Sequence, residues 1–376
     1  MEPEIKTGPI LTHNIKTIHI AGDVSATNTL MAVYSQKTSR QISTIFKAIY
    51  PGQEITDFPN QVITDILQRT QLKPENIETM VLAAAGPIIS NTCQMTNAPF
   101  FLNAQSMGIN TVLINDFRGI AFGVSQSPDK INTMPLEHIC GKPGKAKPKG
   151  RILIAGPGTG YGVTRLGFNT EMEKYVPEDS EGGHKFLSVD YRQPQLVRLA
   201  NYLSDQYFDG KLIHDEAILS GKGIIRVANF FIKDSNKEDS LEVKTLRQLE
   251  TIEQQGAYIA QRAKENPQSV FGITMDTIWK TLGRSLRSNA IHELATGGVY
   301  IAGGSTRKDI LTQKNTKDTH VEYTIMNEFD NGPTHEAIIR KMPVKVIMEK
   351  EIGLQGASYV ALNPDLFQYE LKRATS

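Results

Sequence analysis

The stretch RILIAGPGTGYGV, residues 151–163, decides the fold, because it joins two strand-like runs through a glycine-rich turn. Four apolar residues (152–155) precede four glycines that alternate with Pro157, Thr159 and Tyr161. The run GVTRLG follows the turn, so the pattern predicts strand, turn, strand, and neither a dinucleotide fingerprint nor a P-loop. Such a turn can present amides and the Thr159 hydroxyl to a phosphate, although taken alone it can equally be a tight hairpin.

Apolar runs of the same kind lie on both sides of this stretch and predict further strands. The expected strands are 16–23, 28–35, 79–87, 92–97, 111–116, 297–304 and 344–348. Apolar residues recur at helical spacing in 55–72, in much of 191–293 and in 353–364. We expect exposed loops at 141–150 and 233–240. Apolar strands without alternation, separated by helices, predict an α/β fold whose sheets are covered on both faces.

Length and composition narrow the class of protein. A chain of 376 residues is too long for one typical core and suggests two lobes. The net charge of +1 offers no global field for nucleic acid or an anionic membrane, so we expect neither partner. Two cysteines exclude a disulfide framework and a four-thiolate zinc site, and they favour a reducing compartment.

The chain shows no sign of a targeting or membrane segment. Its first residues lack the basic and apolar regions of a signal peptide, and no run approaches the roughly 20 apolar residues of a membrane span. We therefore expect a cytoplasmic location.

Polar residues follow two other predicted strands at their carboxyl ends, where α/β folds bind ligands. Asp23 leaves its strand into a turn of small residues and could hold a magnesium ion or a water on it, although an ordinary hairpin is the alternative. Asn115 and Asp116 end the run LIND, where a partly desolvated carboxylate can act as a general base toward a hydroxyl. An Asx cap is the simpler alternative at that position.

A fourth candidate is Glu181-Gly-Gly-His184, which places a carboxylate and an imidazole on either side of a flexible pair. This arrangement suits hydrogen bonds to vicinal hydroxyl groups. No further ligands stand at metal spacing, and a lone histidine is more often structural than a ligand.

Taken in order, these motifs resemble the bacterial-type glucokinase family, within the actin-like sugar-kinase superfamily. The combination of INDF, GxGTGxG and EGGH in this order is specific, and the matches run from about residue 16 to about 362. The stretches that carry the resemblance are DVSATN (23–28), AAAGPIISNTCQMTN (83–97), INDF (114–117), GPGTGYG (156–162), EGGH (181–184), EAILSGKG (216–223), GGVYIAGG (297–304) and GLQGAS (353–358). The related kinases with a structural zinc need a cysteine cluster that this chain lacks.

The resemblance implies an α/β fold of two actin-like (ribonuclease H-like) lobes around a central cleft, with sugar deep in the cleft and ATP-Mg above it. We expect 1–15 to be a loose leader. The small lobe would hold 16–115 and be completed by a C-terminal helix at about 361–376, and the large lobe would hold 116–360. The family also suggests a homodimer, which no feature of the sequence supports or opposes.

The resemblance further implies ATP-dependent phosphorylation of the 6-hydroxyl of glucose, with Asp116 as the general base. The sugar ligands it implies are Asn97, Asn115, Asp116, Glu181, His184 and Glu216. The nucleotide-binding residues it implies are Asp23, Thr27, Asn28, Gly158, Thr159, Gly160, Gly303 and Gly304, with Asp23 also holding Mg²⁺.

The chain departs from the family pattern in its first phosphate loop. Ser25 and Ala26 stand where the family has two glycines, and a Cβ resists both a positive φ and close approach to a phosphate. The run APF (98–100) also replaces the usual His-x-Trp. These departures keep an alternative open: a catalytically weak or inactive sugar-binding regulator of the same fold, or a kinase for another hexose.

Overall fold

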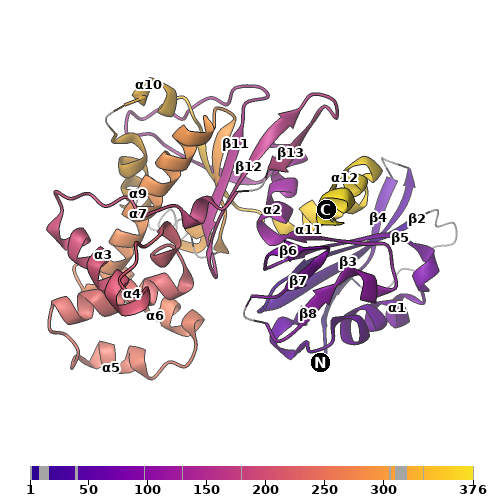
Figure 1. The fold of residues 1–376 in the computed structure, drawn as a ribbon, viewed down its shortest axis with the longest axis horizontal. Helices are drawn as coiled ribbons and strands as arrows, with labels where there is room; N and C mark the ends of the chain where they lie inside the picture. The colour runs from indigo at the N-terminus through magenta and orange to yellow at the C-terminus, as the bar shows by residue number, and fades with distance from the viewer. Residues whose placement is uncertain are drawn as a thin grey trace. The chain divides into compact units, whose positions relative to one another are not determined.

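The computed structural model shows two compact units, each drawn in Figure 1. The structure describes residues 2–7, 17–38, 41–96, 98–128, 130–178, 180–304, 306–309, 320–332 and 334–375. Unit 1 comprises 1–131, 169–177 and 349–376, and unit 2 comprises 132–168 and 178–348. The predicted sugar ligand Asn97 lies outside the described residues.

Unit 1 is built on a mixed sheet with the strand order β1-β4-β3-β2-β5-β9. β2, β5 and β9 run parallel to one another, whereas β1, β4, β3 and β2 form antiparallel pairs. The strands are β1 (Glu4–Thr7), β2 (Thr17–Val24), β3 (Asn28–Thr38), β4 (Gln41–Pro51), β5 (Ile77–Ala84) and β9 (Thr111–Asn115). The central strands are buried on both faces, which is why their apolar residues do not alternate with polar ones.

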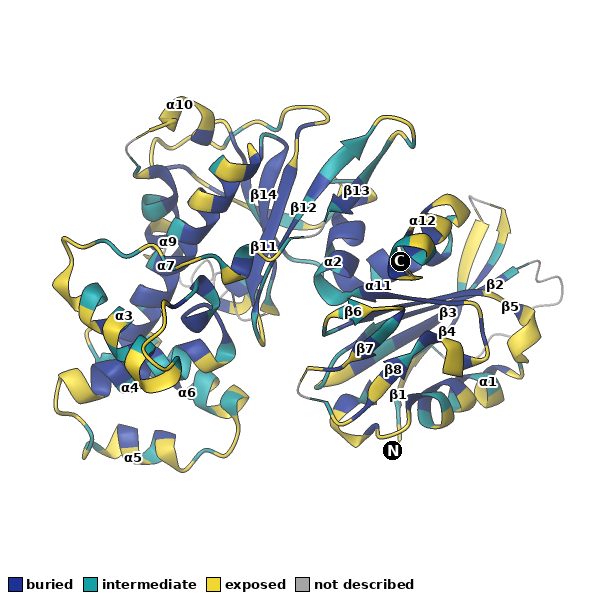
Figure 2. Ribbon diagram, in the orientation of Figure 1, coloured by how far each residue is buried: buried dark blue, intermediate teal, exposed yellow. Residues whose placement is uncertain are grey.

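Helices cover both faces of this sheet (Figures 1 and 2). One face packs against η2 (Pro59–Ile63) and α1 (Thr64–Thr70), and the other against α2 (Asp116–Ser125), α11 (Ile352–Ala361) and α12 (Pro364–Thr375). A small sheet of β6 (Ile88–Ile89), β7 (Thr92–Gln94) and β8 (Phe101–Asn103) completes the unit. Its short helical turns are η1 (Gly52–Glu54), η3 (Pro74–Asn76) and η4 (Ala104–Met107).

Unit 2 has a second mixed sheet with the order β10-β15-β14-β11-β12. Its strands are β10 (Thr133–Leu136), β15 (Val344–Ile347), β14 (Gly298–Ile301), β11 (Ile152–Pro157) and β12 (Tyr161–Asn169), and β13 (Lys174–Glu178) follows in the chain. β11, β14 and β15 run parallel, and β12 returns antiparallel to β11.

The core of unit 2 lies between this sheet and a group of helices that contribute many buried apolar side chains. The longest is α7 (Val270–Glu293), whose Trp279 is buried in that core. The other helices are α3 (Pro194–Tyr207), α4 (Gly221–Asp234), α5 (Leu241–Arg247), α6 (Ile252–Glu265), α9 (His320–Asp330) and α10 (Glu336–Ile339). Two helical turns, η5 (Gly182–His184) and η6 (Asp215–Ala217), carry predicted site residues.

The predicted strands and helices are observed nearly in position, but the structure also contains elements that were not predicted, among them β4, β10, β13, α2 and α9. Within the expected loose leader, residues 4–7 form β1 and pair with β4. The first unit also extends past the expected boundary at 115 to residue 131, because α2 packs against α11 and against β5. For the same reason unit 1 takes the C-terminal segment from residue 349 rather than from about 361.

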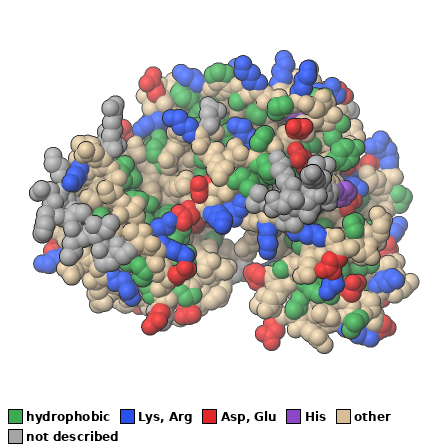
Figure 3. All heavy atoms as spheres, turned by 180° about the vertical axis from the view of Figure 1, so that it is seen from behind, with side chains coloured by type: hydrophobic (Ala, Val, Ile, Leu, Met, Phe, Trp, Pro, Cys, Tyr) green, Lys and Arg blue, Asp and Glu red, His purple; other side chains and the backbone are tan. Residues whose placement is uncertain are grey.

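The surface fits the nearly neutral composition. Lys and Arg side chains are interspersed with Asp and Glu side chains on the face drawn in Figure 3. In the described part of the chain, no helix is both long enough and apolar enough to cross a membrane.

A buried ion pair fastens α12 to α2 within unit 1. Arg118 donates to both carboxylate oxygens of Glu370, at 2.7 and 2.6 Å, and the two side chains are only 4% and 0% exposed. We expect Glu370→Gln to lower the free energy of unfolding by about 3–5 kcal/mol, because it removes the carboxylate charge from a buried, doubly hydrogen-bonded ion pair. Urea unfolding checks this. An Arg118→Met, Glu370→Met double variant should recover most of the loss, and a double variant as unstable as the single one would contradict the charge argument.

A second buried pair makes the stability of unit 2 depend on pH. His138 bonds Asp330 Oδ1 through Nδ1 at 2.6 Å and the Met342 carbonyl through Nε2 at 2.9 Å. Burial alone would lower the pKa of His138, but the hydrogen bond and charge of Asp330 outweigh it and raise the pKa above 6.5. The stabilisation is therefore complete below about pH 6.5 and is lost as the pH rises through the folded-state pKa.

We expect the melting temperature to fall between pH 6 and pH 8.5 and the fall to be smaller in His138→Gln, which cannot titrate. Calorimetry at both pH values measures the difference. The same pH dependence in the variant and the wild type would show that another group is responsible.

Candidate active site

In unit 1, the predicted polar residues lie together at the carboxyl ends of three parallel strands. Asp23 pairs with Ala83 in the β2–β5 ladder, and Ala84 pairs with Asn115 in the β5–β9 ladder. Asp116 is the first residue of α2, directly after β9. This is the edge at which an α/β sheet binds its ligands, so the strand-end placement predicted from the sequence is confirmed.

Asn115 caps α2 and thereby fixes the residue beside it. Its Oδ1 accepts the N–H of Phe117 at 3.0 Å, and its side-chain amide donates to the Gly86 carbonyl at 3.1 Å. The same N–H of Phe117 also lies 2.9 Å from Asp116 Oδ1. The simpler alternative of an Asx cap is thus correct for Asn115, and its consequence is that the Asp116 carboxylate is held in place.

The two carboxylates of this edge both have raised pKa values. Burial, and secondarily the charge of Asp116, raises the pKa of Asp23 to about 7. Burial raises the pKa of Asp116 to about 6, against hydrogen bonds that lower it. Paired carboxylates suit Mg²⁺, which binds through one or two of them together with phosphates and water. No group of three or more His, Cys, Asp or Glu among the described residues could hold a metal alone.

The first loop is not strained at the two residues that replace the family glycines. Neither Ser25 nor Ala26 is among the described residues with positive φ. Ser25 instead closes its own turn, because its hydroxyl donates to the Asn28 carbonyl at 2.8 Å. Thr27 and Asn28 are exposed beyond it. The replacement of glycine therefore causes no backbone strain at these two positions. Only the space that each Cβ occupies distinguishes this loop from the family pattern.

Gly353 is a residue of this edge that the sequence analysis did not assign to the site. A Cβ at this position, near the start of α11, would overlap Oδ2 of Asp23. Glycine is thus required for the close approach of α11 to Asp23. The signal was present in the motif GLQGAS, but nothing in the sequence connects it with Asp23.

In unit 2, the stretch 151–163 forms the predicted strand, turn and strand. β11 and β12 pair from Ile152 opposite Leu166 to Pro157 opposite Tyr161. The turn is closed by the Gly158 N–H, which donates to the Gly160 carbonyl at 2.7 Å, and the Gly221 N–H donates to the Gly158 carbonyl at 3.0 Å. Thr159 is exposed at the tip of the turn.

Glu216 connects this hairpin with the predicted sugar ligands. Its Oε2 accepts the Tyr161 N–H at 2.7 Å, and its Oε1 lies 3.7 Å from His184 Nε2. His184 Nδ1 is 3.1 Å from Glu181 Oε2. A Cβ on Gly160 would overlap the Glu216 carboxylate, so the glycine is needed for this contact. The structure thus brings Glu181, His184 and Glu216 together beside the glycine-rich turn.

The two glycines after β14 lie near the same turn. Gly303 has a φ of +114°, and a Cβ there would lie 2.5 Å from the Pro157 carbonyl oxygen. Gly304 is exposed, and the nearest described atom to a Cβ built there is Nη2 of Arg307 at 4.0 Å. The geometry leaves room for a ligand at Gly304. Gly303 allows the backbone to approach β11 closely.

A buried polar network under Glu216 was not predicted. Tyr161 Oη lies 3.0 Å from Ser285 Oγ, which donates to Asp215 Oδ2 at 2.5 Å. Lys185 Nζ lies 3.5 Å from the same carboxylate. These contacts anchor η6, and therefore Glu216, to α7. Their residues are far apart in the sequence and form no motif, so no sequence signal could have identified them.

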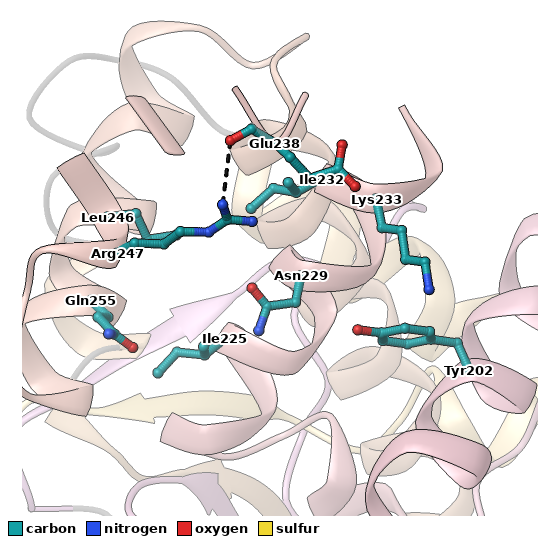
Figure 4. A pocket seen from close by; sticks show the side chains of 9 residues that line it. All are labelled: Tyr202, Ile225, Asn229, Ile232, Lys233, Glu238, Leu246, Arg247 and Gln255. Atoms are coloured by element: carbon teal, nitrogen blue, oxygen red, sulfur yellow. Dashed lines mark hydrogen bonds between the residues drawn. The ribbon is translucent and has the colours of Figure 1, made fainter. Parts of the chain in front are cut away.

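A cavity of about 460 Å³ lies apart from these residues, among α3, α4, α5 and α6 (Figure 4). It is lined by Tyr202, Ile225, Asn229, Ile232, Lys233, Glu238, Leu246, Arg247 and Gln255. Arg247 donates to the Glu238 carbonyl, Lys233 lies over the Tyr202 ring and Gln255 donates to the Leu249 carbonyl. These polar groups are engaged within the protein, so the lining does not point to a particular ligand.

The fold and these motifs are those of sugar kinases of the actin-like class. A structure of glucokinase from Balamuthia mandrillaris in complex with glucose has a TM-score of 0.74 at 21% identity, covering 92% of this chain and 94% of that one. A ROK family glucokinase from Streptomyces griseus in complex with glucose and AMPPNP has a TM-score of 0.54 at 15% identity, covering 92% and 99%. The predicted fold class is thereby confirmed.

The glucokinase family model matches residues 20–364, and the chain belongs to this family. A glucokinase from Nostoc punctiforme is 29% identical over 363 residues, which cover 92% of this chain and 99% of that protein. The relatives are thus similar over nearly the whole chain.

The two glycines of the turn give a matched test of the Glu216 contact. We expect Gly160→Ala to lower the free energy of unfolding by about 1–3 kcal/mol, because its Cβ displaces the carboxylate that accepts the Tyr161 N–H. Gly158→Ala should change it by less than about 1 kcal/mol, since the nearest atom to its Cβ is 4.0 Å away. Urea unfolding compares the two. Equal losses would mean that the turn itself, and not Glu216, resists a side chain.

Proposed function

We propose that this protein is an ATP-dependent glucokinase that phosphorylates the 6-hydroxyl of glucose. The observation that carries the proposal is the set of Glu181, His184 and Glu216 fixed beside a glycine-rich turn. Two carboxylates and an imidazole can accept from and donate to vicinal hydroxyls, while the turn offers amides to phosphate. Membership of the glucokinase family and the glucose in the Balamuthia mandrillaris structure support the same reaction.

Asp116 is our candidate for the general base that accepts the proton of the attacking hydroxyl. Its raised pKa of about 6 brings it closer to neutral pH than an ordinary aspartate, which is where general bases are most efficient. Its carboxylate is oriented by the Phe117 N–H. Asn115 is the neighbouring sugar ligand in this proposal, although its amide already bonds the Gly86 carbonyl.

Each unit offers candidate residues for nucleotide binding. In unit 2 the candidates are the exposed Gly158 and Thr159, with Gly160, Gly303 and Gly304 beside them. In unit 1 they are Asp23, Thr27 and Asn28. The AMPPNP in the Streptomyces griseus structure supports ATP as the donor. Mg²⁺ would be held at Asp23 and would neutralise phosphate charge, and the carboxylate pair of unit 1 fits that role.

The second candidate function is a sugar-binding protein with weak or no kinase activity, or a kinase for another hexose. Ser25 and Ala26 favour it, because each places a Cβ in the first loop. A coupled ADP-release assay over a panel of hexoses separates the candidates. Glucose binding without turnover of any sugar would support the sugar-binding protein. A cytoplasmic location and a homodimer remain predictions, and the two free cysteines, Cys93 and Cys140, are compatible with the first.

Replacing the candidate base tests the proposed chemistry. We expect Asp116→Asn to lower kcat at least 100-fold, because general base catalysis contributes about 10²–10⁴-fold. Its glucose affinity, measured by calorimetry, should change by less than about threefold, since the amide keeps the shape of the carboxylate. Asp205→Asn, at an exposed position on α3, is the control and should behave like the wild type. A kcat within tenfold of the wild type would remove Asp116 from this role.

A further inference from the structure

His214 is a second histidine of the unit 2 site and belongs to none of the motifs of the sequence analysis. It stands directly before η6 and so two residues before Glu216. Its ring centroid is 4.9 Å from that of His184, with 48° between the ring planes. The two imidazoles are therefore in contact with their planes tilted, although they come from different segments of the chain.

His214 also contacts the ring of Phe208, which in turn contacts a cation. The ring of Phe208, at the end of α3, meets His214 edge-on with centroids 5.5 Å apart. The guanidinium of Arg226, on α4, lies over Phe208 at 5.1 Å. A chain of contacts thus extends from α3 and α4 to the exposed imidazole of the site, in the order Arg226, Phe208, His214 and His184. A ring held in this way can support His184 but has little freedom of its own.

One ring nitrogen of His214 takes no part in hydrogen bonding within the protein. Its Nδ1 is buried and has no hydrogen-bond partner. Burial lowers the pKa of His214, and the neighbouring His184 and Arg226 act in the same direction, while Glu216 opposes them. His214 is therefore a neutral ring at neutral pH, and its role is contact rather than charge.

The orientation of His184 matters because its two nitrogens face different groups. Nδ1 faces the Glu181 carboxylate, which can only accept when ionised, so Nδ1 carries the proton. Nε2 lies 3.7 Å from Glu216, too far for a hydrogen bond. Nε2 is thereby left to accept from a hydroxyl. A flip of the ring would exchange the two nitrogens and remove this acceptor.

We propose that His214 is a positioning residue, whose ring, held by Phe208, fixes the His184 imidazole with Nε2 free for a sugar hydroxyl. The inference rests on the proposed function in so far as His184 binds sugar. The inference goes beyond the proposed function, because it gives a residue outside the motifs a role in sugar specificity and affinity.

Three variants of the full chain test this role. His214→Ala removes the ring, and we expect the KM for glucose to rise about tenfold with kcat within twofold, because only sugar binding loses a fixed acceptor. His214→Phe keeps the ring and should hold KM within twofold of the wild type. His292→Ala removes an exposed histidine elsewhere in unit 2 and should change neither constant.

Nitrogen-15 spectra of the histidine rings at pH 8, without sugar, give a readout that does not depend on turnover. His184→Gln identifies the His184 signals. The wild type and His214→Phe should show a single His184 tautomer protonated at Nδ1, and His214→Ala should show averaged shifts of two tautomers.

Two results would overturn the inference. One is a His214→Ala protein with unchanged His184 signals. The other is a parallel loss of kcat, KM and melting temperature that His214→Phe does not rescue, which marks a merely structural residue. If the wild type fails to turn over glucose, the proposed function fails, and the spectra still decide the role of His214.

Discussion

The hydrogen bond from the Tyr161 N–H to the Glu216 carboxylate is the contact on which the unit 2 site depends. It joins the start of β12 to η6, and so places a carboxylate directly against the turn that precedes it. Gly160 makes the contact possible because it has no Cβ to occupy the position of the carboxylate. The candidate sugar-binding residues of this unit are consequently in direct contact with the candidate phosphate-binding turn. A substitution in one of them is expected to displace the other.

In unit 2 the Glu216 carboxylate accepts a backbone N–H, whereas in unit 1 two carboxylates are buried at the same edge of a sheet. Asp23 and Asp116 are brought together at the ends of parallel strands, and each is destabilised in its charged form mainly by burial. Such a pair lowers the stability of the fold, and a bound cation, as proposed for Mg²⁺ at Asp23, would supply the compensating charge. The close approach of α11 at Gly353 adds a second constraint at the same place.

The sequence predicted much of this arrangement, because its informative residues are local. The hairpin around 156–162 follows from glycines between two apolar runs, and Asp23 and Asp116 follow from strand ends. α2 was not predicted, since Gly119 and Gly123 weaken its helical pattern, and they are needed where α2 packs on α11. His214 and Asp215 could not be found from the sequence, because their partners Phe208, His184 and Ser285 are assembled only by the fold.

The fastening of α12 to α2 through Arg118 and Glu370 has a consequence for biosynthesis. The two residues are 252 positions apart, and one face of the unit 1 sheet is covered by apolar residues of α11 and α12. While the ribosome is still making unit 2, that face therefore lacks the part of its cover that α11 and α12 supply, and it presents apolar surface to water. The earliest strands must wait for the last helices, and during this interval the nascent chain is a natural client for chaperones.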